Sequence, residues 1–275
     1  MAMVINTNMG AINANRVLDA TGRDQSVAME RLTSGLRINK AADDAAGLAV
    51  ATGMTTQVMG TDQAVRNAND GISLIQTQDG AMEEVVNMMQ RMRELAVQSL
   101  NGTYNAENRA QMDQEYDQLA SEIVRVGNTT KFNEVSLMDG TTTTISLHVG
   151  WETGANNKIN VSTMNVATSI GAGLSNNTIS TVAGASLAIG SIDNLLSAVN
   201  TKRATWGALQ NRLESTVSNL NNVNENISAS RSRIQDADFA KESANLARTQ
   251  VLQQAGMSML SQANQNSQNV LSLVR

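Results

Sequence analysis

The chain has 275 residues and a formal net charge of −5, and 41% of its residues are apolar, with only two each of Phe, Tyr and Trp. Its lysines and arginines form no basic run longer than the pair Lys202 and Arg203, and aromatic side chains are too few to stack bases, so we expect no nucleic-acid partner. The absence of cysteine excludes disulfides and thiolate metal sites. The absence of proline permits long unbroken helices, since a proline inside a helix costs about 3 kcal/mol.

The N-terminus does not have the basic segment and following apolar segment of a cleaved signal peptide. No stretch of about 18 apolar residues, the length that a membrane-spanning helix needs, occurs in the chain. We therefore expect a soluble protein with no membrane partner, which uses no cleaved signal peptide if it is exported.

Residue patterns of the common enzyme classes are missing from the sequence. The one histidine, His148, cannot form a two-histidine zinc motif, and neither a G-x-S-x-G motif nor a phosphate-binding glycine motif occurs. The adjacent carboxylates of Glu83 and Glu84 point apart on a helix. We expect no enzymatic activity, no catalytic residue, no metal site and no cofactor.

Both ends of the chain, residues 1–50 and 227–275, have the spacing of weakly amphipathic helices. Neither end carries enough apolar bulk to be stable alone, because an isolated helix in water is marginal. We expect the two ends to lie against each other and against other copies, which predicts a self-assembling filament subunit whose ends are disordered in the free monomer. The predicted subunit-packing residues are Val4, Ala11, Leu18, Leu32, Leu252, Met259, Val270 and Leu273.

Two further helices are predicted in the first half of the chain. Residues 45–100 carry apolar side chains at helical spacing. The next helix has Asn105 as its N-cap and Glu107 in its first turn. Its apolar face comprises Met112, Tyr116, Leu119, Ile123 and Val126.

The composition changes to Thr, Ser, Asn and Gly over residues 138–190. The apolar period there falls to two at Ile145, Leu147 and Val149, and a second alternating run starts with Ile159 and Val161. This spacing predicts short strands and loops. We expect this segment to form an exposed tip between two helical halves.

Coiled-coil spacing follows over residues 191–235. Apolar residues recur there at intervals of seven, at Ile192, Val199, Trp206, Leu213, Leu220 and Ile227. The segment is a natural antiparallel partner for residues 45–100.

The elements together predict a mainly α fold: an elongated antiparallel helical bundle or coiled coil with a small β-rich tip and both termini at the same end. We expect residues 1–44 and 236–275 to form a terminal helical domain. Residues 45–140 and 191–235 should form a helical-bundle domain, and residues 141–190 a short variable tip.

Several blocks of the sequence resemble bacterial flagellins, in the order that this family has them. They are residues 5–8 (INTN), 31–39 (RLTSGLRIN), 42–49 (ADDAAGLA), 90–98 (QRMRELAVQ), 230–239 (SRSRIQDADF), 251–256 (VLQQAG) and 268–275 (QNVLSLVR). The chain departs from the family pattern in lacking a proline near its end and in having a very short central segment. The large variable outer domains of many flagellins are therefore expected to be missing.

The resemblance implies a structural subunit of the extracellular bacterial flagellum, used for motility. It implies export of the unfolded chain through the type III flagellar apparatus and assembly into a helical homopolymer, with the terminal helices lining an inner tube. An export chaperone, the filament cap and the hook-junction proteins are the further partners that it implies.

Two sites have more than one interpretation. Arg91, Leu95 and Glu115 occupy positions that resemble the surface recognised, on monomers, by the flagellin-sensing Toll-like receptor of animals; the same surface can serve subunit contacts. Residues 31–48 can form a loop followed by a helix N-cap at Asp43 or Asp44, or a spoke that joins inner and outer tubes and shifts between two packings.

Two other protein classes share part of the pattern. A hook-filament junction protein of the flagellin-like family would have the terminal helices but need not have the block at residues 90–98. A secreted coiled-coil adhesin would lack the paired signatures at the two ends. The residues present favour the filament subunit.

Overall fold

The structure is a computed structural model that describes residues 7–273, with side chains described for residues 7–265. The chain is mainly helical, as predicted from its apolar spacing and lack of proline. Its residues divide into two compact units. The first unit combines the described residues up to Thr56 with those from Glu225 onward, and the second spans Gln57–Asn224.

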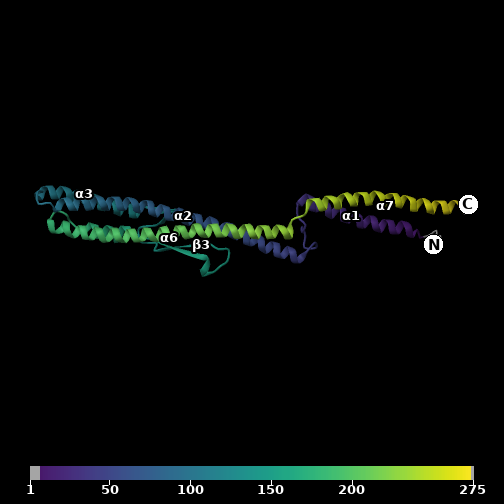
Figure 1. Cartoon of the computed structure of the whole chain (residues 1–275), viewed down its shortest axis with the longest axis horizontal. Helices are drawn as coiled ribbons and strands as arrows, with labels where there is room; N and C mark the ends of the chain where they lie inside the picture. Colours follow the sequence, from purple (N-terminus) through teal and green to yellow (C-terminus); the bar gives the residue numbers. More distant parts are fainter. Residues whose placement is uncertain (1–6, 274–275) are drawn as a thin grey trace. The chain divides into compact units, whose positions relative to one another are not determined.

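The first unit contains α1 (Met9–Ser34) and α7 (Phe239–Leu273), which lie side by side (Figure 1). The Asn8 side chain caps α1 by accepting a hydrogen bond from the Ala11 amide, and α1 ends at Gly35, which has a left-handed φ of 72°. The pair is antiparallel: the Asn8 side chain donates to the Ala263 carbonyl near the end of α7. The start of α1 and the end of α7 therefore lie at the same end of the pair.

The second unit is built on α2 (Ala45–Leu100) and α6 (Val182–Gln235), with α3 (Ala106–Thr129) alongside (Figure 1). The α2 and α6 helices are antiparallel, as ion pairs along them show. Arg93 Nε lies 2.7 Å from Asp193 Oδ1, and Arg203 Nε lies 2.6 Å from Asp79 Oδ1. The predicted boundary at residue 45 coincides with the start of α2, whereas α6 begins nine residues before the predicted 191.

The core of this unit uses the predicted heptad positions. Ile192, Val199, Trp206 and Leu213 are fully buried on α6, whereas Leu220 and Ile227 are half-buried. The four fully buried residues of α6 share the core with Met82, Met89 and Leu95 of α2 and with Tyr116 and Ile123 of α3. One window of α6 is apolar enough to pass a length-and-composition test for a membrane span, with a mean hydropathy of 1.4; a helix that belongs to the core of a soluble protein passes the same test.

Short elements connect α3 to α6. These are β1 (Lys131–Phe132), β2 (Val135–Ser136), β3 (Thr144–His148), the 3-10 turn η1 (Ala155–Asn157), β4 (Lys158–Ser162), α4 (Val166–Ser169) and α5 (Gly171–Ser175). The alternation predicted the β3–β4 hairpin, whose antiparallel register places Ile145 opposite Val161 and Leu147 opposite Ile159.

The hairpin is packed along the helices, and the prediction of an exposed tip is wrong for it. The Trp206 indole donates to the Ser162 carbonyl at 2.8 Å, and the Asn67 side chain donates to the His148 carbonyl at 2.9 Å. The reason is the apolar face of β4, since Ile159 and Val161 are 4% and 0% exposed and need helices to cover them.

Candidate functional site

The contact between α1 and α7 is thin and rests on small and polar residues. Among the described side chains of the two helices, the buried ones are Thr21 and Ala28 of α1 and Glu242 and Thr249 of α7. Gly256 lets the helices approach closely, because a Cβ there would lie 2.9 Å from Cδ2 of Leu18. Few large apolar side chains are therefore buried between the two helices.

Large apolar side chains instead remain on the outside of the pair. They are between 39% and 68% exposed and comprise Met9, Ile12, Val17, Val27, Met29, Phe239, Val251, Leu252, Met257 and Met259. Single exposed apolar residues are normal, but so many on one helix pair mark an interaction surface. We call this set the assembly surface. In the sequence of the same helix, no charged residue occurs between Arg248 and Arg275.

The predicted subunit-packing residues separate into two groups. Ala11, Leu18 and Leu32 are half-buried on α1. Leu252 and Met259 are 49% and 66% exposed, so α1 does not cover them, and their packing against other subunits stays a prediction. The turns of α7 that are buried with α1 carry Glu242 and Thr249 instead. Val4 and the side chains of Val270 and Leu273 lie outside the described residues.

Sequence reasoning missed part of the assembly surface. Phe239, Val251 and Met257 are at least 60% exposed and were not among the predicted packing residues. The apolar residues of α7 do not form one clear stripe, so periodicity could not find them. The long run without charge after Arg248 is the signal that could have done so.

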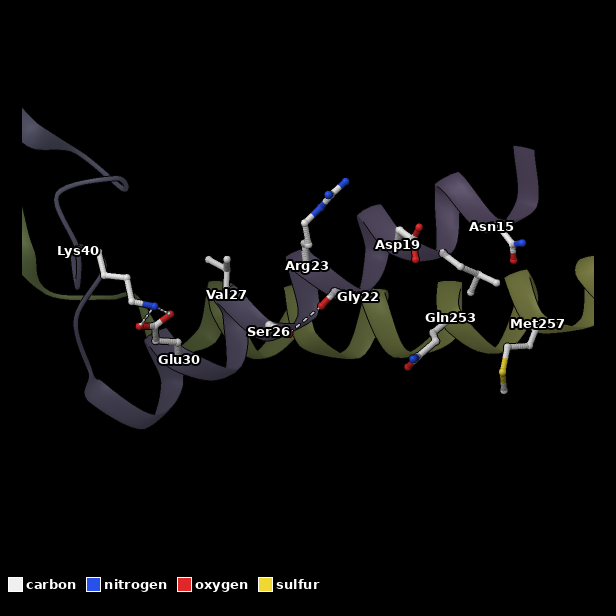
Figure 2. A pocket seen from close by; sticks show the side chains of 11 residues that line it. Asn15, Asp19, Gly22, Arg23, Ser26, Val27, Glu30, Lys40, Gln253 and Met257 are labelled. Atoms are coloured by element: carbon white, nitrogen blue, oxygen red, sulfur yellow. Dashed lines mark hydrogen bonds and ion pairs between the residues drawn. The ribbon is translucent and has the colours of Figure 1, made fainter. Parts of the chain in front are cut away.

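A groove of about 810 Å³ runs beside α1 (Figure 2). Leu18, Val27 and Met257 supply apolar lining, and Lys40 closes one end by an ion pair of 2.7 Å to Glu30. The hydrogen bond to the Glu30 carboxylate raises the pKa of Lys40. The groove is open and mixed in character, which suits a segment of another protein chain better than a small substrate.

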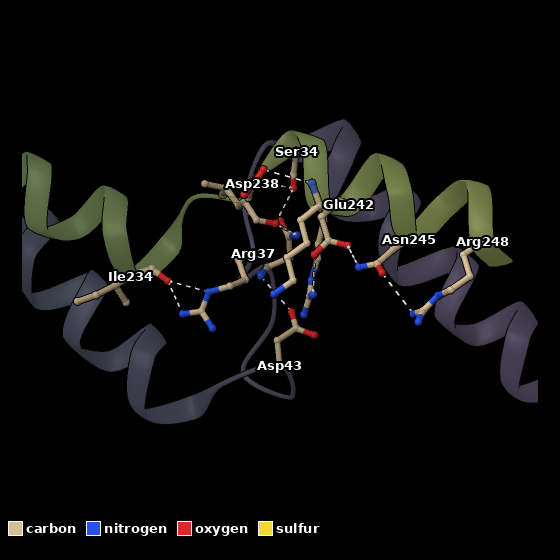
Figure 3. A network of polar contacts seen from close by, with 12 residues as sticks. Ser34, Arg37, Asp43, Ile234, Asp238, Glu242, Asn245 and Arg248 are labelled. Atoms are coloured by element: carbon tan, nitrogen blue, oxygen red, sulfur yellow. Dashed lines mark hydrogen bonds and ion pairs between the residues drawn. The ribbon is translucent and has the colours of Figure 1, made fainter.

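A polar clasp joins the loop after α1 to the end of α6 within the same unit (Figure 3). The Arg37 guanidinium donates twice to the Ile234 carbonyl, at 3.2 and 2.5 Å, and so satisfies a carbonyl in the last turn of α6. The Arg37 amide donates to the Gln235 carbonyl at 2.7 Å, and the Ala237 amide donates to the Gly35 carbonyl at 2.9 Å. These backbone bonds hold the two connecting segments together.

The capping interpretation of the acidic pair is confirmed. The Asp44 carboxylate accepts a hydrogen bond from the Gly47 amide at 2.8 Å in the first turn of α2. The Asp43 carboxylate accepts from the amides of Lys40 and Asn39, which lower its pKa and order the turn before the helix. The spoke interpretation stays a prediction.

Arg91 and Leu95 lie on α2, and Glu115 lies on α3. Arg91 and Glu115 are exposed and in contact, whereas Leu95 is not exposed. Arg91 Nη2 lies 2.9 Å from Glu115 Oε1. Hydrogen bonds to the carboxylates of Glu115 and Glu94 raise the pKa of the Arg91 guanidinium. Leu95 is 2% exposed and belongs to the core. Recognition of these positions by the receptor stays a prediction, in which Leu95 is not on the exposed surface because α2 turns it inward.

Among the described residues, no group of three His, Cys, Asp or Glu side chains is placed to hold a metal ion. His148 lies in β3, and its backbone carbonyl accepts the hydrogen bond from Asn67. The candidate functional site of the described residues is therefore the assembly surface on α1 and α7.

Comparison with known proteins gives consistent results over the whole chain. Residues 5–143 match the N-terminal helical region of bacterial flagellins, and residues 189–274 match the C-terminal helical region. A flagellin of Halalkalibacterium halodurans is 46% identical over 273 residues, which cover 99% of this chain and all of that protein. The 31.3 kDa flagellar filament core protein of Treponema maltophilum is 41% identical, with 99% of this chain and all of that protein covered.

Solved structures show the same likeness. The crystal structure of Bacillus cereus flagellin aligns with a TM-score of 0.50 and 30% identity, covering 56% of this chain and 88% of that one. A putative flagellar hook-associated protein from Vibrio parahaemolyticus aligns with a TM-score of 0.58 at 14% identity, covering 70% of this chain and all of that one. The second comparison concerns the fold alone.

Proposed function

Because the chain belongs to the bacterial flagellin family and is a structural subunit of the flagellar filament, we propose that its terminal helices are completed only by neighbouring subunits in that filament. The family is structural and not enzymatic, and its filament is part of the extracellular flagellum. The observation that carries the proposal is the assembly surface, whose ten large apolar side chains α1 and α7 do not bury against each other.

The free energies of ordering and of burial favour coupling between the folding of the terminal helices and assembly. Ordering one residue costs about 1–2 kcal/mol, whereas fully burying a Val, Leu or Met side chain contributes about 1.5–3 kcal/mol. With so few large side chains buried between them, α1 and α7 gain little on their own. Contacts with other subunits would bury the assembly surface and make the balance favourable, so both helices should be largely disordered in the free chain.

Lack of charge in the second half of α7 supports a position deep in the polymer. Removing an ionised side chain from water is expensive unless it is paired. Between Arg248 and Arg275 the chain has no such group, so this segment can be enclosed by neighbours at little electrostatic cost. We assign residues 1–44 and 236–275 to an inner tube, residues 45–140 and 191–235 to the surrounding helical bundle, and residues 141–190 to a short variable segment.

The remaining partners follow from family membership. We assign to this chain an export chaperone, type III export in the unfolded state, the filament cap and the hook-junction proteins. The absence of proline and cysteine suits a chain that must refold at a growing end, because neither prolyl isomerisation nor disulfide formation can delay it. Recognition of the monomer by the flagellin-sensing Toll-like receptor would use Arg91 and Glu115, since Leu95 is buried.

A hook-filament junction protein is the second candidate, and it shares the fold. Its support is a structural likeness at 14% identity, whereas the filament core proteins match over their full length at about 40% identity or more. The filament subunit is therefore the assignment that we make.

Seeded elongation tests the proposal. Short filament fragments are mixed with the purified chain, and growth is followed by light scattering and electron microscopy. The intact chain should extend the seeds, and a chain lacking residues 1–39 should not. The double substitution Val251→Ser and Leu252→Ser should slow growth, whereas Val135→Ser, at a residue of β2 that is 43% exposed, should not.

Hydrogen exchange provides a second measurement on the same samples. Amides of α1 and α7 should exchange quickly in the free chain and slowly in the filament. Strong protection of both helices in dilute chain, or growth by the truncated chain, would overturn the proposal.

A further inference from the structure

We propose that Met257 and Met259 form an oxidation-sensitive site, at which conversion of the thioethers to sulfoxides by a peroxide prevents the subunit from joining the filament. The inference rests on the proposed function of the assembly surface. It adds a chemical modification by which an oxidant would act on filament growth.

Accessibility is the first requirement, because an oxidant must reach the sulfur atom. Met257 and Met259 are 60% and 66% exposed, whereas Met82, Met89 and Met92 in the core are 0% exposed. In the reaction the peroxide O–O bond breaks, one oxygen binds to sulfur, and water or an alcohol leaves. The sulfur atom loses two electrons to the peroxide, so no further reactant is needed.

Burial of the two residues by neighbouring subunits is disfavoured once their side chains are polar. Both lie in the part of α7 that has no charged residue. Met257 also lines the groove beside α1, at the end where Asn15 lies (Figure 2). Oxidation replaces an apolar, adaptable side chain with a strong hydrogen-bond acceptor. An acceptor enclosed by neighbours without a donor destabilises the contact.

Exposed methionines elsewhere differ in their neighbours. Met29 is 53% exposed on α1 and is followed in the sequence by the charged residues Glu30 and Arg31, whereas no charged residue occurs near Met257 and Met259 in the sequence. Met59 lies on α2 in the second unit and is 66% exposed, the same value as Met259. Met59 should therefore oxidise about as readily as Met259 and is not part of the assembly surface. It is the matched control.

The test treats the full-length chain with dilute hydrogen peroxide, quenches the reaction, and measures seeded elongation. Peptide mass spectrometry reports the sulfoxide at each methionine. We expect treated wild-type chain to elongate about tenfold more slowly or worse, which corresponds to about 1.4 kcal/mol per subunit. Each variant is compared with its own untreated sample, so altered growth before treatment does not affect the result.

Three variants separate the sites. Chain with Met257→Leu and Met259→Leu should keep most of its own untreated rate. Chain with Met59→Leu should lose as much as wild type, and chain with Met9→Leu and Met29→Leu measures the part of the loss that comes from the other two methionines of the assembly surface. Equal loss in the Met257→Leu, Met259→Leu chain, or full growth of wild type with both sulfoxides formed, would overturn the inference.

Two measurements need no variant. Treatment of oxidised wild-type chain with methionine sulfoxide reductases should restore elongation, and in assembled filaments the two residues should oxidise far more slowly than in free chain. Failure of both would contradict the inference. Failure of untreated wild-type chain to elongate would instead contradict the proposed function, so the two are distinguishable.

Discussion

Arg31 and Glu242 form an ion pair across α1 and α7, with 3.1 Å between Nη1 and Oε1, and only 9% of the Glu242 side chain is exposed. The other carboxylate oxygen of Glu242 accepts a hydrogen bond from the Asn245 side chain at 3.3 Å. The two helices therefore share a nearly buried charge in a contact that is otherwise thin. Such a pair fixes the register of the helices, because sliding by one turn would leave the carboxylate without its cation.

Arg31→Ala should weaken the filament by about 1–2 kcal/mol per subunit. This is less than the 3–5 kcal/mol typical of a fully buried pair, because 27% of the Arg31 side chain is exposed to solvent. The critical concentration for elongation should rise about 5- to 30-fold. Arg16→Ala is the control, since Arg16 is exposed on α1 and donates to Asn13 of the same helix. Equal effects of the two substitutions would contradict a role in register.

Gly60→Ala should destabilise the second unit, because the hairpin loop rests directly on that residue. A Cβ at Gly60 would lie 2.7 Å from Cβ and 3.4 Å from Cα of Trp151. We expect a loss of about 1–3 kcal/mol in the free energy of unfolding. Gly80→Ala in the same helix meets nothing within 4 Å and should stabilise by about 0.5–1 kcal/mol. Urea unfolding measures both, and effects of the same sign would refute the packing argument.

Glu134→Gly should stabilise the β1–β2 hairpin. Asn133 and Glu134 form its turn with φ values of 46° and 65°, and a left-handed conformation costs a side-chain-bearing residue about 1–2 kcal/mol. Part of the gain is lost to the greater freedom of glycine in the unfolded chain, so we expect about 0.5–1 kcal/mol. Glu134→Ala keeps the strain and serves as the control. No difference between the two substitutions in urea unfolding would mean that the turn is not strained.

Stability should fall in alkaline solution through Tyr116. Burial in the core raises the pKa of Tyr116 from 10.0 to about 12, with Asp117 and Asp113 adding to the shift. The unfolded chain then releases the proton at lower pH than the folded chain. The contribution of Tyr116 to the free energy of unfolding is up to about 2.7 kcal/mol. It is fully present below about pH 10 and is lost between about pH 10 and 12.

Tyr116→Phe removes this contribution. Relative to its value at about pH 8, the stability of wild type should fall about 1 kcal/mol further than that of the variant by about pH 11. The comparison cancels the titration of other groups, which both chains share. Parallel pH profiles for the two proteins would show that Tyr116 does not titrate in this way.

Local rules predicted the elements that depend on the chain itself. Asn105 caps α3 by accepting from the Asn108 amide at 2.8 Å, and the alternation at Ile145 and Leu147 predicted strand β3. Repeats of seven placed Trp206 and Leu213 in the core. Each of these depends on neighbours in sequence, and on a regular spacing that a helix or strand converts into one face.

Surfaces that depend on several elements were predicted less well. Leu95 was expected at an exposed site, but α2 turns it into the core. Leu252 and Met259 were predicted to pack between subunits, and the structure leaves both exposed within one chain. The second half of α7 has few strongly apolar or charged residues. The sequence of such a helix does not indicate which of its faces is buried.

By itself, the sequence determined the long helices, the cap of α3, the coiled-coil spacing, the presence of short strands and the family. Only the tertiary structure decided which apolar side chains are covered within one chain and which remain for another. The physical reason is that periodicity defines faces relative to the axis of one helix. Which neighbour covers a face depends on the packing of all the elements around it.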